Sequence, residues 1–348
     1  MHGRASAAIA AALSLALSLA LSFGQPAAGP ARAEEAVTVR AAPVASFDPQ
    51  HADQAVFGGL RYLGGLQLDS SDKRFGGLSG LEISPDGHRL MMVSDVGDLF
   101  SATLDHAGRA PAGLSQVTVE RLIDEDGAPL GAKFGADAEA LRAVGGNGLT
   151  NDVMVAFERD NRVLRYSFGP DGRLARASPV AMPAAIADLP YNQGLEALAV
   201  IPPGAPGAGS LVALAESEST ARPGTIPGWV IAPDGSSREI GLIRDGDFNV
   251  TDAVALANGD VIVLERRFNV LTGVAMRVRR ISAAELAREE PISGVVLLAA
   301  GMAYAVDNME GIAVHTDEAG RTVLSIISDD NFNTLQRTLL LQFELLDP

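Results

Sequence analysis

The feature that most constrains the fold is a short phrase that occurs five times at nearly even spacing. Each copy has an oxygen-bearing residue in third place, then a small residue, then an aliphatic one. The copies are Gly77–Leu81, Asp137–Leu141, Gly194–Leu198, Val250–Val254 and Asn308–Ile312. Their third residues are Ser79, Glu139, Glu196, Asp252 and Glu310, which gives steps of 56 to 60 residues. A fixed period of this size indicates a repeat architecture.

A second element follows each phrase: an apolar run of strand length that ends in another carboxylate. The runs are rich in β-branched and aliphatic residues and are bounded by turn residues such as Pro85-Asp86-Gly87. Their terminal carboxylates are Asp95, Glu158, Glu216, Glu265 and Asp329. One unit is therefore a loop carboxylate, a strand, a turn, a strand and a second carboxylate. Five copies in register predict two rings of acidic groups around one axis.

This unit predicts an all-β fold, a single β-propeller. Four antiparallel strands with loops fit the period, whereas a β-helix repeats every 20 to 25 residues or so. Helical periodicity is weak; the best candidate runs from Ser282 to Glu289, where Ser282 and Glu285 can form a capping box. The final run, Leu339–Leu346, predicts a strand that closes the ring by pairing with N-terminal strands.

The number of blades depends on the part of the chain that carries no phrase. The interval from Glu310 to the C-terminus, continued from Glu34 to Ser79, is longer than one unit and shorter than two. This favours six blades, one of them built from both termini, with five as the alternative.

The first 33 residues have the pattern of a secretory signal. Arg4 precedes an apolar stretch from about Ala7 to Phe23, and Ala31-Arg32-Ala33 forms a small-residue cleavage site. An uncleaved membrane anchor is the alternative, but the apolar stretch is near the lower limit for a span. We therefore expect cleavage after Ala33, no membrane span in the mature chain, and a periplasmic or secreted protein. Residues 34–55 are predicted to be a lead-in segment with an edge strand, and residues 56–348 the propeller domain.

Charge and cysteine content narrow the ligand classes. Cleavage removes Arg4 and Arg32 from the 27 basic residues and none of the 43 acidic ones, so the net charge changes from −16 to −18. Such a surface repels nucleic acid and attracts cations, and we expect no nucleic-acid partner. The chain has no Cys and only five His, which disfavours a structural zinc site and leaves oxygen-only sites open.

Three groups of motifs point to a family. They are Phe75–Leu81 with Ser94-Asp95, Asp137–Leu141 with Phe157-Glu158-Arg159, and Asp307–Ile312 with Ser328–Phe332. In this order they resemble the phytase-like family of bacterial exported proteins, described as esterase-like activity of phytase. The resemblance covers about residues 56–346. It implies a β-propeller and a hydrolase of phosphate esters or other esters.

The predicted acidic rings would repel themselves unless protons, arginines or cations neutralise them. Ca²⁺ takes six to eight oxygen ligands or so, and the predicted metal ligands are Asp95, Glu139, Glu196, Asp252, Glu310 and Asp329. The predicted catalytic residues are Glu139, Glu310, Arg159 and Arg266, the carboxylates acting as base and the arginines holding the anion. The alternative for each acid is a structural role, capping a loop or accepting backbone N–H bonds.

Two functional interpretations follow. The first is an exported monomer that hydrolyses a small phosphate ester or related ester with the help of Ca²⁺. The second is a non-catalytic periplasmic propeller that binds a ligand or partner protein through its loops. A serine esterase is disfavoured because the chain has no Gly-x-Ser-x-Gly elbow, and Ser79 lies in a phrase with different spacing.

Overall fold

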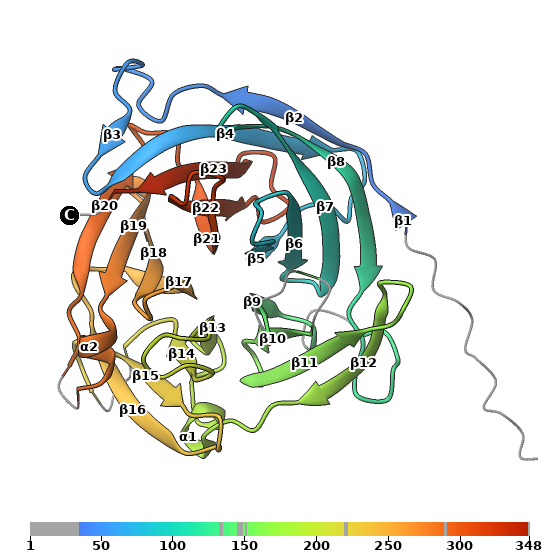
Figure 1. Ribbon diagram of the computed structural model, residues 1–348, viewed down its shortest axis with the longest axis vertical. Coiled ribbons are helices and arrows are strands. Elements are labelled where there is room, and N and C mark those ends of the chain that lie inside the picture. Colours follow the sequence, from blue (N-terminus) through green and yellow to red (C-terminus); the bar gives the residue numbers. More distant parts are fainter. Residues whose placement is uncertain are drawn as a thin grey trace, which may run out of the picture. The chain divides into compact units, whose positions relative to one another are not determined.

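Five antiparallel β-sheets follow one another along the chain and surround a common axis as the blades of a propeller (Figure 1). The structure is a computed structural model that describes residues 35–131, 135–144, 149, 152–218, 222–288 and 291–346. The predicted all-β propeller is confirmed. The predicted signal, residues 1–33, lies outside the described residues and stays a prediction. In the described part of the chain, no helix has the length and apolarity needed to span a membrane.

The repeated phrase forms the innermost strand of every blade, nearest the axis in Figure 1. These strands are β5 (Leu78–Ile83), β9 (Ala138–Ala143), β13 (Leu195–Val200), β17 (Asn249–Ala255) and β21 (Asn308–Thr316). Each inner strand contacts the inner strands of the two neighbouring blades. We call the end of the ring where these strands begin the acidic face, and the other end the opposite face.

The apolar runs form the second strand of each blade, and two more strands continue each sheet outward. The second strands are β6 (Arg89–Ser94), β10 (Val153–Phe157), β14 (Leu211–Ala215), β18 (Val261–Asn269) and β22 (Thr322–Asp329). The third strands are β7 (Asp98–Ala107), β11 (Arg162–Phe168), β15 (Thr225–Ile231), β19 (Gly273–Ile281) and β23 (Thr338–Leu345). The fourth strands are β8 (Ala110–Arg121), β12 (Leu174–Pro179), β16 (Ser237–Ile243), β20 (Val295–Gly301) and β4 (Leu60–Ser70).

The termini close the ring, as predicted, because N-terminal β4 pairs antiparallel with C-terminal β23. The favoured count of six blades is wrong, and the alternative of five is correct. The surplus residues of the wrap-around interval extend existing sheets: β2 (Val39–Val44) and β3 (Val56–Phe57) pair with β4, and β1 (Glu35–Ala36) pairs with β8. Pairing of this kind covers sheet edges without the core that a sixth blade would need.

The hydrophobic core is divided among the five interfaces between blades. Each cluster of buried aliphatic and aromatic side chains joins two neighbouring sheets. The second strands are buried on both faces for this reason; all five residues of β10 and of β14 are buried. Packing on two sides explains why these segments are continuous apolar runs rather than alternating ones.

Among the described residues, α-helix is confined to two single turns, α1 (Ala184–Ala187) and α2 (Ala283–Leu286). The predicted capping box at α2 is confirmed: Ser282 accepts from the Glu285 backbone N–H, and the Glu285 carboxylate accepts from the Ser282 N–H. The helix itself is shorter than the predicted segment.

Candidate metal centre

Every inner strand carries a β-bulge at the same point, close to the acidic face. A bulge puts one extra residue on one strand of a pair and changes the direction of its side chain. The five bulged residues are Ser79, Glu139, Glu196, Thr251 and Glu310. In each blade, the bulge within the repeated phrase therefore turns one polar side chain toward the axis.

In the fourth blade the bulge lies one residue before the position that the phrase predicted. Thr251, not Asp252, matches Ser79. The Thr251 hydroxyl donates to the carbonyl oxygens of Leu264 and Met309 (3.4 and 3.2 Å). In the first blade, Ser79 makes the equivalent bonds to the carbonyl oxygens of Val93 and Ala138. Asp252 occupies the small-residue position that is Gly80 in the first blade. The structure therefore does not place Asp252 with the other predicted metal ligands.

The second acidic position shows the same displacement in the fourth blade. Asp95, Glu158, Glu216 and Asp329 each follow the residue that pairs with the position just before the bulge of the inner strand. In β18 the pairing residue is Glu265 itself, so Arg266 takes the equivalent position. The predicted outer ring of acids is consequently interrupted by one arginine.

These side chains meet in a cavity of about 360 Å³ on the acidic face. It is lined by eight carboxylates and two arginines. We call the eight carboxylates the acidic cluster: Asp95, Asp137, Glu139, Glu158, Glu196, Glu216, Glu310 and Asp329. Five of the six predicted metal ligands, and all four predicted catalytic residues, line this cavity. The acids of the cluster therefore lie together on one face and form a common site.

The two arginines neutralise only part of this charge. Arg266 Nε lies 3.0 Å from Glu310 Oε1, and its guanidinium is 4.0 Å from Glu216 Oε1. Arg159 is paired with Asp137 and donates to the Tyr191 hydroxyl at 2.8 Å. Two arginines can balance the charge of two carboxylates, which leaves six of the eight carboxylates without a matching positive charge, so the cavity is strongly electronegative.

Several carboxylates of the cluster have raised pKa values, as expected where negative charges outnumber positive ones. Burial first, together with the neighbouring carboxylates, raises the pKa of Glu158 and of Glu310 to about 7 and that of Asp329 to about 8. The pKa values of Glu139 and Glu196 are raised well above the ordinary range, first by burial and then by the surrounding acids. Repulsion of this kind favours the binding of protons or cations.

Two triads of carboxylates within the cluster have the spacing of metal ligands. Asp137, Glu139 and Glu158 each offer an oxygen within 4.8 Å of the others, as do Glu158, Glu196 and Glu216. Glu158 belongs to both triads. All of these donors are oxygens, which suits a hard cation such as Ca²⁺ better than Zn²⁺ or Cu²⁺. The residues present therefore fit the predicted ion.

Below the cluster, the axis is closed by a buried ion pair that the sequence analysis missed. Arg142 is 2% exposed and forms an ion pair with Asp252 at 2.5 Å. Its guanidinium also donates to the carbonyl oxygens of Leu198, Ala253 and Leu81 at 2.7 to 2.9 Å, which come from three other blades. Burial still holds the pKa of Asp252 up, at about 7, against the opposing effect of Arg142. The available signal was a single arginine inside an apolar inner strand.

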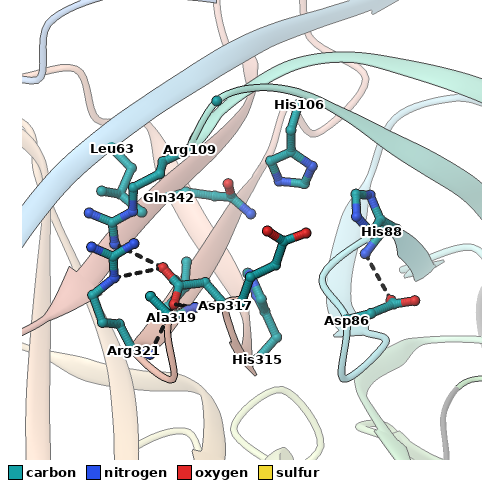
Figure 2. A pocket seen from close by; sticks show the side chains of 13 residues that line it. Leu63, Asp86, His88, His106, Arg109, His315, Asp317, Ala319, Arg321 and Gln342 are labelled. Carbon is teal, nitrogen blue, oxygen red and sulfur yellow. Dashed lines mark hydrogen bonds and ion pairs between the residues drawn. The ribbon is translucent and has the colours of Figure 1, made fainter.

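The histidines lie elsewhere. His88, His106 and His315 line a separate cavity on the opposite face (Figure 2). Ser79 uses its hydroxyl to bond backbone carbonyls, and no histidine lines the acidic cavity. The structure accordingly offers no Ser/His/Asp arrangement at the acidic cluster among the described residues.

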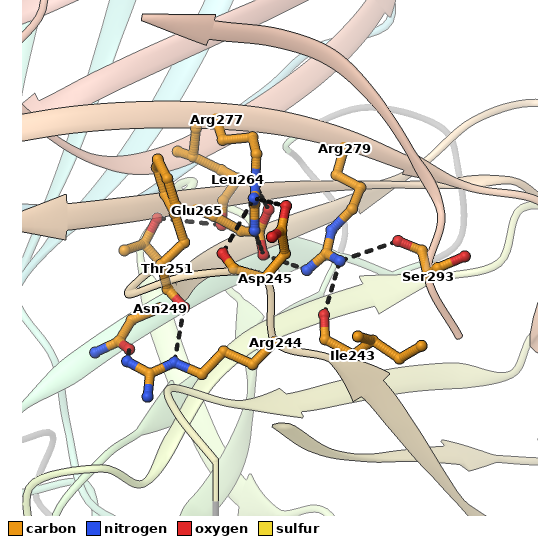
Figure 3. A network of polar contacts seen from close by, with 11 residues as sticks. Ile243, Arg244, Asp245, Asn249, Thr251, Leu264, Glu265, Arg277, Arg279 and Ser293 are labelled. Atoms are coloured by element: carbon orange, nitrogen blue, oxygen red, sulfur yellow. Dashed lines mark hydrogen bonds and ion pairs between the residues drawn. The ribbon is translucent and has the colours of Figure 1, made fainter. Parts of the chain in front are cut away.

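Glu265 takes a structural role in the fourth blade (Figure 3). It is fully buried, and both of its oxygens bond Arg277, at 2.6 and 3.0 Å; Arg279 forms a further ion pair with it. Arg279 also donates to the carbonyl oxygens of Ile243 and Ser293. A carboxylate with two arginines has no need of a cation.

The comparisons with known proteins agree with the resemblance in the sequence. The model of the phytase-like family, described as esterase-like activity of phytase, matches residues 73–332. The chain belongs to the phytase-like family. The comparison with curated proteins gave no match.

Two solved structures show a partial likeness. A luciferin-regenerating enzyme is 9% identical with a TM-score of 0.39, and the alignment covers 87% of this chain and 95% of that one. A bifunctional GH43-CE protein of Bacteroides eggerthii is 10% identical with a TM-score of 0.43, over 78% of this chain and 33% of that one. At these values neither likeness bears on fold or function.

Proposed function

We propose that this phytase-like protein is an exported hydrolase that cleaves a small phosphate ester or related ester at the acidic cluster with the help of bound Ca²⁺. The observation that carries the proposal is the gathering of eight carboxylates and two arginines in one cavity. Membership in a family described as esterase-like supports a hydrolytic activity. The location, the ester class, the ion and a monomeric state are parts of the proposal.

The carboxylates have the acid strength that proton transfer at neutral pH requires. General acids and bases work best when their pKa is near the working pH, and the pKa values of Glu158 and Glu310 are about 7. We assign Glu310, oriented by Arg266 at 3.0 Å, as the base that accepts a proton from the attacking water. Glu139, whose pKa is raised well above the ordinary range first by burial and then by Asp137, Glu310 and Glu158, is assigned as the acid that protonates the leaving oxygen.

The two arginines are the groups that hold an anionic substrate. Arg159 is on the loop after β10, and its side chain is one-quarter exposed, so a ligand in the cavity has access to it. Arg266 lies across the cavity on β18. A guanidinium binds phosphate oxygens through paired N–H bonds. Ca²⁺ held by the triad Glu158, Glu196 and Glu216 would polarise the phosphoryl group and lower the pKa of a bound water, and this placement leaves Glu139 free to act as the acid.

The test is a phosphomonoester assay on the purified protein, with Ca²⁺ and after chelation, combined with metal analysis. We expect turnover to require Ca²⁺, and Glu310→Gln or Glu139→Gln to reduce it by about a hundredfold or more while the fold is kept. Glu239→Gln is the matched control, since Glu239 is an exposed partner of Arg222 on the outer strand β16. Unchanged turnover in excess chelator would eliminate the mechanism. If chelation shifts only the melting temperature and broad substrate panels stay blank, the non-catalytic binding protein is correct.

A further inference from the structure

The acidic cavity is polar on every described side. All of the described residues that line it carry charged, amide or hydroxyl side chains. Such a cavity binds an ion and a phosphoryl group, but it offers no apolar contact to the alcohol portion of an ester. Selection among alcohols therefore depends on residues at the rim of the cavity.

One rim segment carries an exposed aromatic ring. It is the loop of residues 330–337, which joins β22 to β23. Asn331 of this loop lines the acidic cavity. The next residue, Phe332, is 46% exposed and lines a neighbouring groove of about 1150 Å³. Phe332 therefore lies at the boundary between the acidic cavity and a space large enough for the rest of a substrate.

The ring of Phe332 lies directly over the segment that leads into the inner strand of the first blade. A Cβ at Gly76 would be 2.9 Å from Phe332 Cδ1. A Cβ at Gly77 would be 2.5 Å from Phe332 Cε2 and equally close to Asp95 Oδ1. The absence of side chains at these two glycines makes room for the ring. The edge of the ring is consequently a neighbour of the Asp95 carboxylate, a member of the acidic cluster.

Hydrogen bonds from Asp330 hold the ring in this position. Asp330 Oδ1 accepts from the Gly77 N–H at 3.1 Å and from the Phe332 N–H at 3.0 Å. Asp330 Oδ2 accepts from the Thr338 hydroxyl at 3.1 Å. One carboxylate thus joins the loop to the first blade and to β23. A side chain that is already held loses little conformational entropy when a ligand packs on it.

The backbone of the loop does not explain why this residue is a phenylalanine. Asn331 and Phe332 have φ values of +48° and +50°, a region that bulky residues rarely occupy. Glycine adopts it at no steric cost. Residues held in such conformations are concentrated at functional sites. The strain therefore points to a role for the aromatic side chain itself.

The other exposed ring beside the cavity is already in use. Tyr191 is also 46% exposed, but the Arg159 guanidinium lies 5.2 Å from its ring centroid and donates to its hydroxyl at 2.8 Å. Phe332 makes no ring–ring or cation–π contact in the described part of the chain. Its exposed surface is available to a ligand.

We propose that Phe332 determines the specificity of the acidic cavity for the alcohol portion of its substrate, and that this portion carries an aromatic ring. The phosphoryl group lies in the cavity, and the ring of the substrate packs on Phe332 at the entrance to the groove. Two aromatic rings pack offset or edge to face, a contact that a small alkyl group does not make. The inference rests on the proposed function, because it names the substrate class of the same site.

The experiment compares phenylphosphonate with methylphosphonate, which carry the same anionic group and contain no ester bond. Each is titrated into the Ca²⁺-loaded full chain, and binding is measured by calorimetry. We expect phenylphosphonate to bind about tenfold more tightly than methylphosphonate. Phe332→Gly should abolish this difference and leave methylphosphonate binding unchanged, whereas Phe332→Tyr should keep the difference.

Two features of the loop supply the controls. Glycine adopts the φ of residue 332 without strain, so Phe332→Gly should keep its fold, which its melting temperature checks. Leu335→Ala removes an apolar side chain that is 89% exposed in the same loop, and it should not change the difference. The proposal is overturned if the native protein binds the two phosphonates equally or binds neither. It is also overturned if Phe332→Gly keeps the difference or if Leu335→Ala removes it.

Turnover of phenyl phosphate and methyl phosphate is measured separately and distinguishes this proposal from the proposed function. If phenylphosphonate binding depends on Phe332 but neither ester is cleaved, the hydrolytic function is wrong and the aromatic specificity of the site is correct. If both esters are cleaved equally well by the native protein and by Phe332→Gly, the hydrolytic function is correct and the aromatic specificity is wrong.

Discussion

Glu265 is next in sequence to Arg266, which lines the cavity of the acidic cluster, yet the carboxylates of the two sites differ in how their charge is balanced. Glu265 is shared by Arg277 and Arg279, and its charge is matched inside the fourth blade. The eight carboxylates of the acidic cluster share Arg159 and Arg266. The comparison separates two roles for the acid at the end of the second strand. Where arginines outnumber acids, the acid has a structural role, and where acids outnumber arginines, it is a candidate metal ligand.

The largest expected effect is a loss of folding stability on substitution of Glu265. Glu265→Gln keeps the shape of the side chain but removes the carboxylate that Arg277 and Arg279 share, which leaves Arg277 with only the exposed Asp245 carboxylate as a counter-charge. Breaking a buried pair in this way costs about 3 to 5 kcal/mol of folding free energy. Urea denaturation should show this loss with and without Ca²⁺. A loss below about 1 kcal/mol, the range of the exposed control Glu239→Gln, would mean that Glu265 is not held as the contacts indicate.

The second effect is the pH dependence of the metal-free protein. The pKa values of Glu158, Glu310 and Asp329 are raised, so the folded protein binds protons more tightly than the unfolded chain does. Their contribution to stability is present at low pH and is lost as the pH rises through about 7 to 8. In chelator the melting temperature should therefore fall between about pH 5 and pH 8, on the order of 5 °C.

Added Ca²⁺ should flatten this fall, because the ion replaces the protons in neutralising the cluster. Scanning calorimetry at several pH values, with and without Ca²⁺, makes the measurement. A melting temperature in chelator that stays level or rises toward pH 8 would contradict the assignment of repulsion to the cluster.

The smallest expected change in folding stability is that of Glu158→Gln without metal, and its sign is opposite to that of Glu265→Gln. Removing one charge from the shared position of both triads relieves repulsion, so stability in chelator should stay level or rise by about 1 kcal/mol. The stabilisation by Ca²⁺ should be reduced at the same time. Destabilisation equal to that of Glu265→Gln would remove the distinction between the two sites.

Much of the fold was readable from local patterns. The phrase and the apolar run specify an inner strand, a turn and a second strand, and the terminal run around Leu341 predicts the closing strand that pairs with β4. The blade count was not readable, since whether surplus residues form a sixth sheet or widen existing ones depends on pairing between β1, β2 and β3 and distant strands.

The site was predicted in outline and misplaced by one residue in the fourth blade. Thr251 and Asp252 both carry oxygen, and Glu265 and Arg266 are both charged, so the sequence pattern accepts either register. The bulge decides between them, and its position is set by the pairing of Val250 with Glu265. A shift of one residue along a strand reverses the side to which a side chain points.

The sequence by itself determined the repeat, the strands and the oxygen-rich composition of the axis, because these are local properties of each unit. Only the tertiary structure decided which charges meet. Arg142 finds Asp252 from another blade, Glu265 finds two arginines on β19, and His88 finds His106 across a hairpin. Electrostatic pairing depends on distance in space, and closure of the ring brings together groups that the chain keeps far apart.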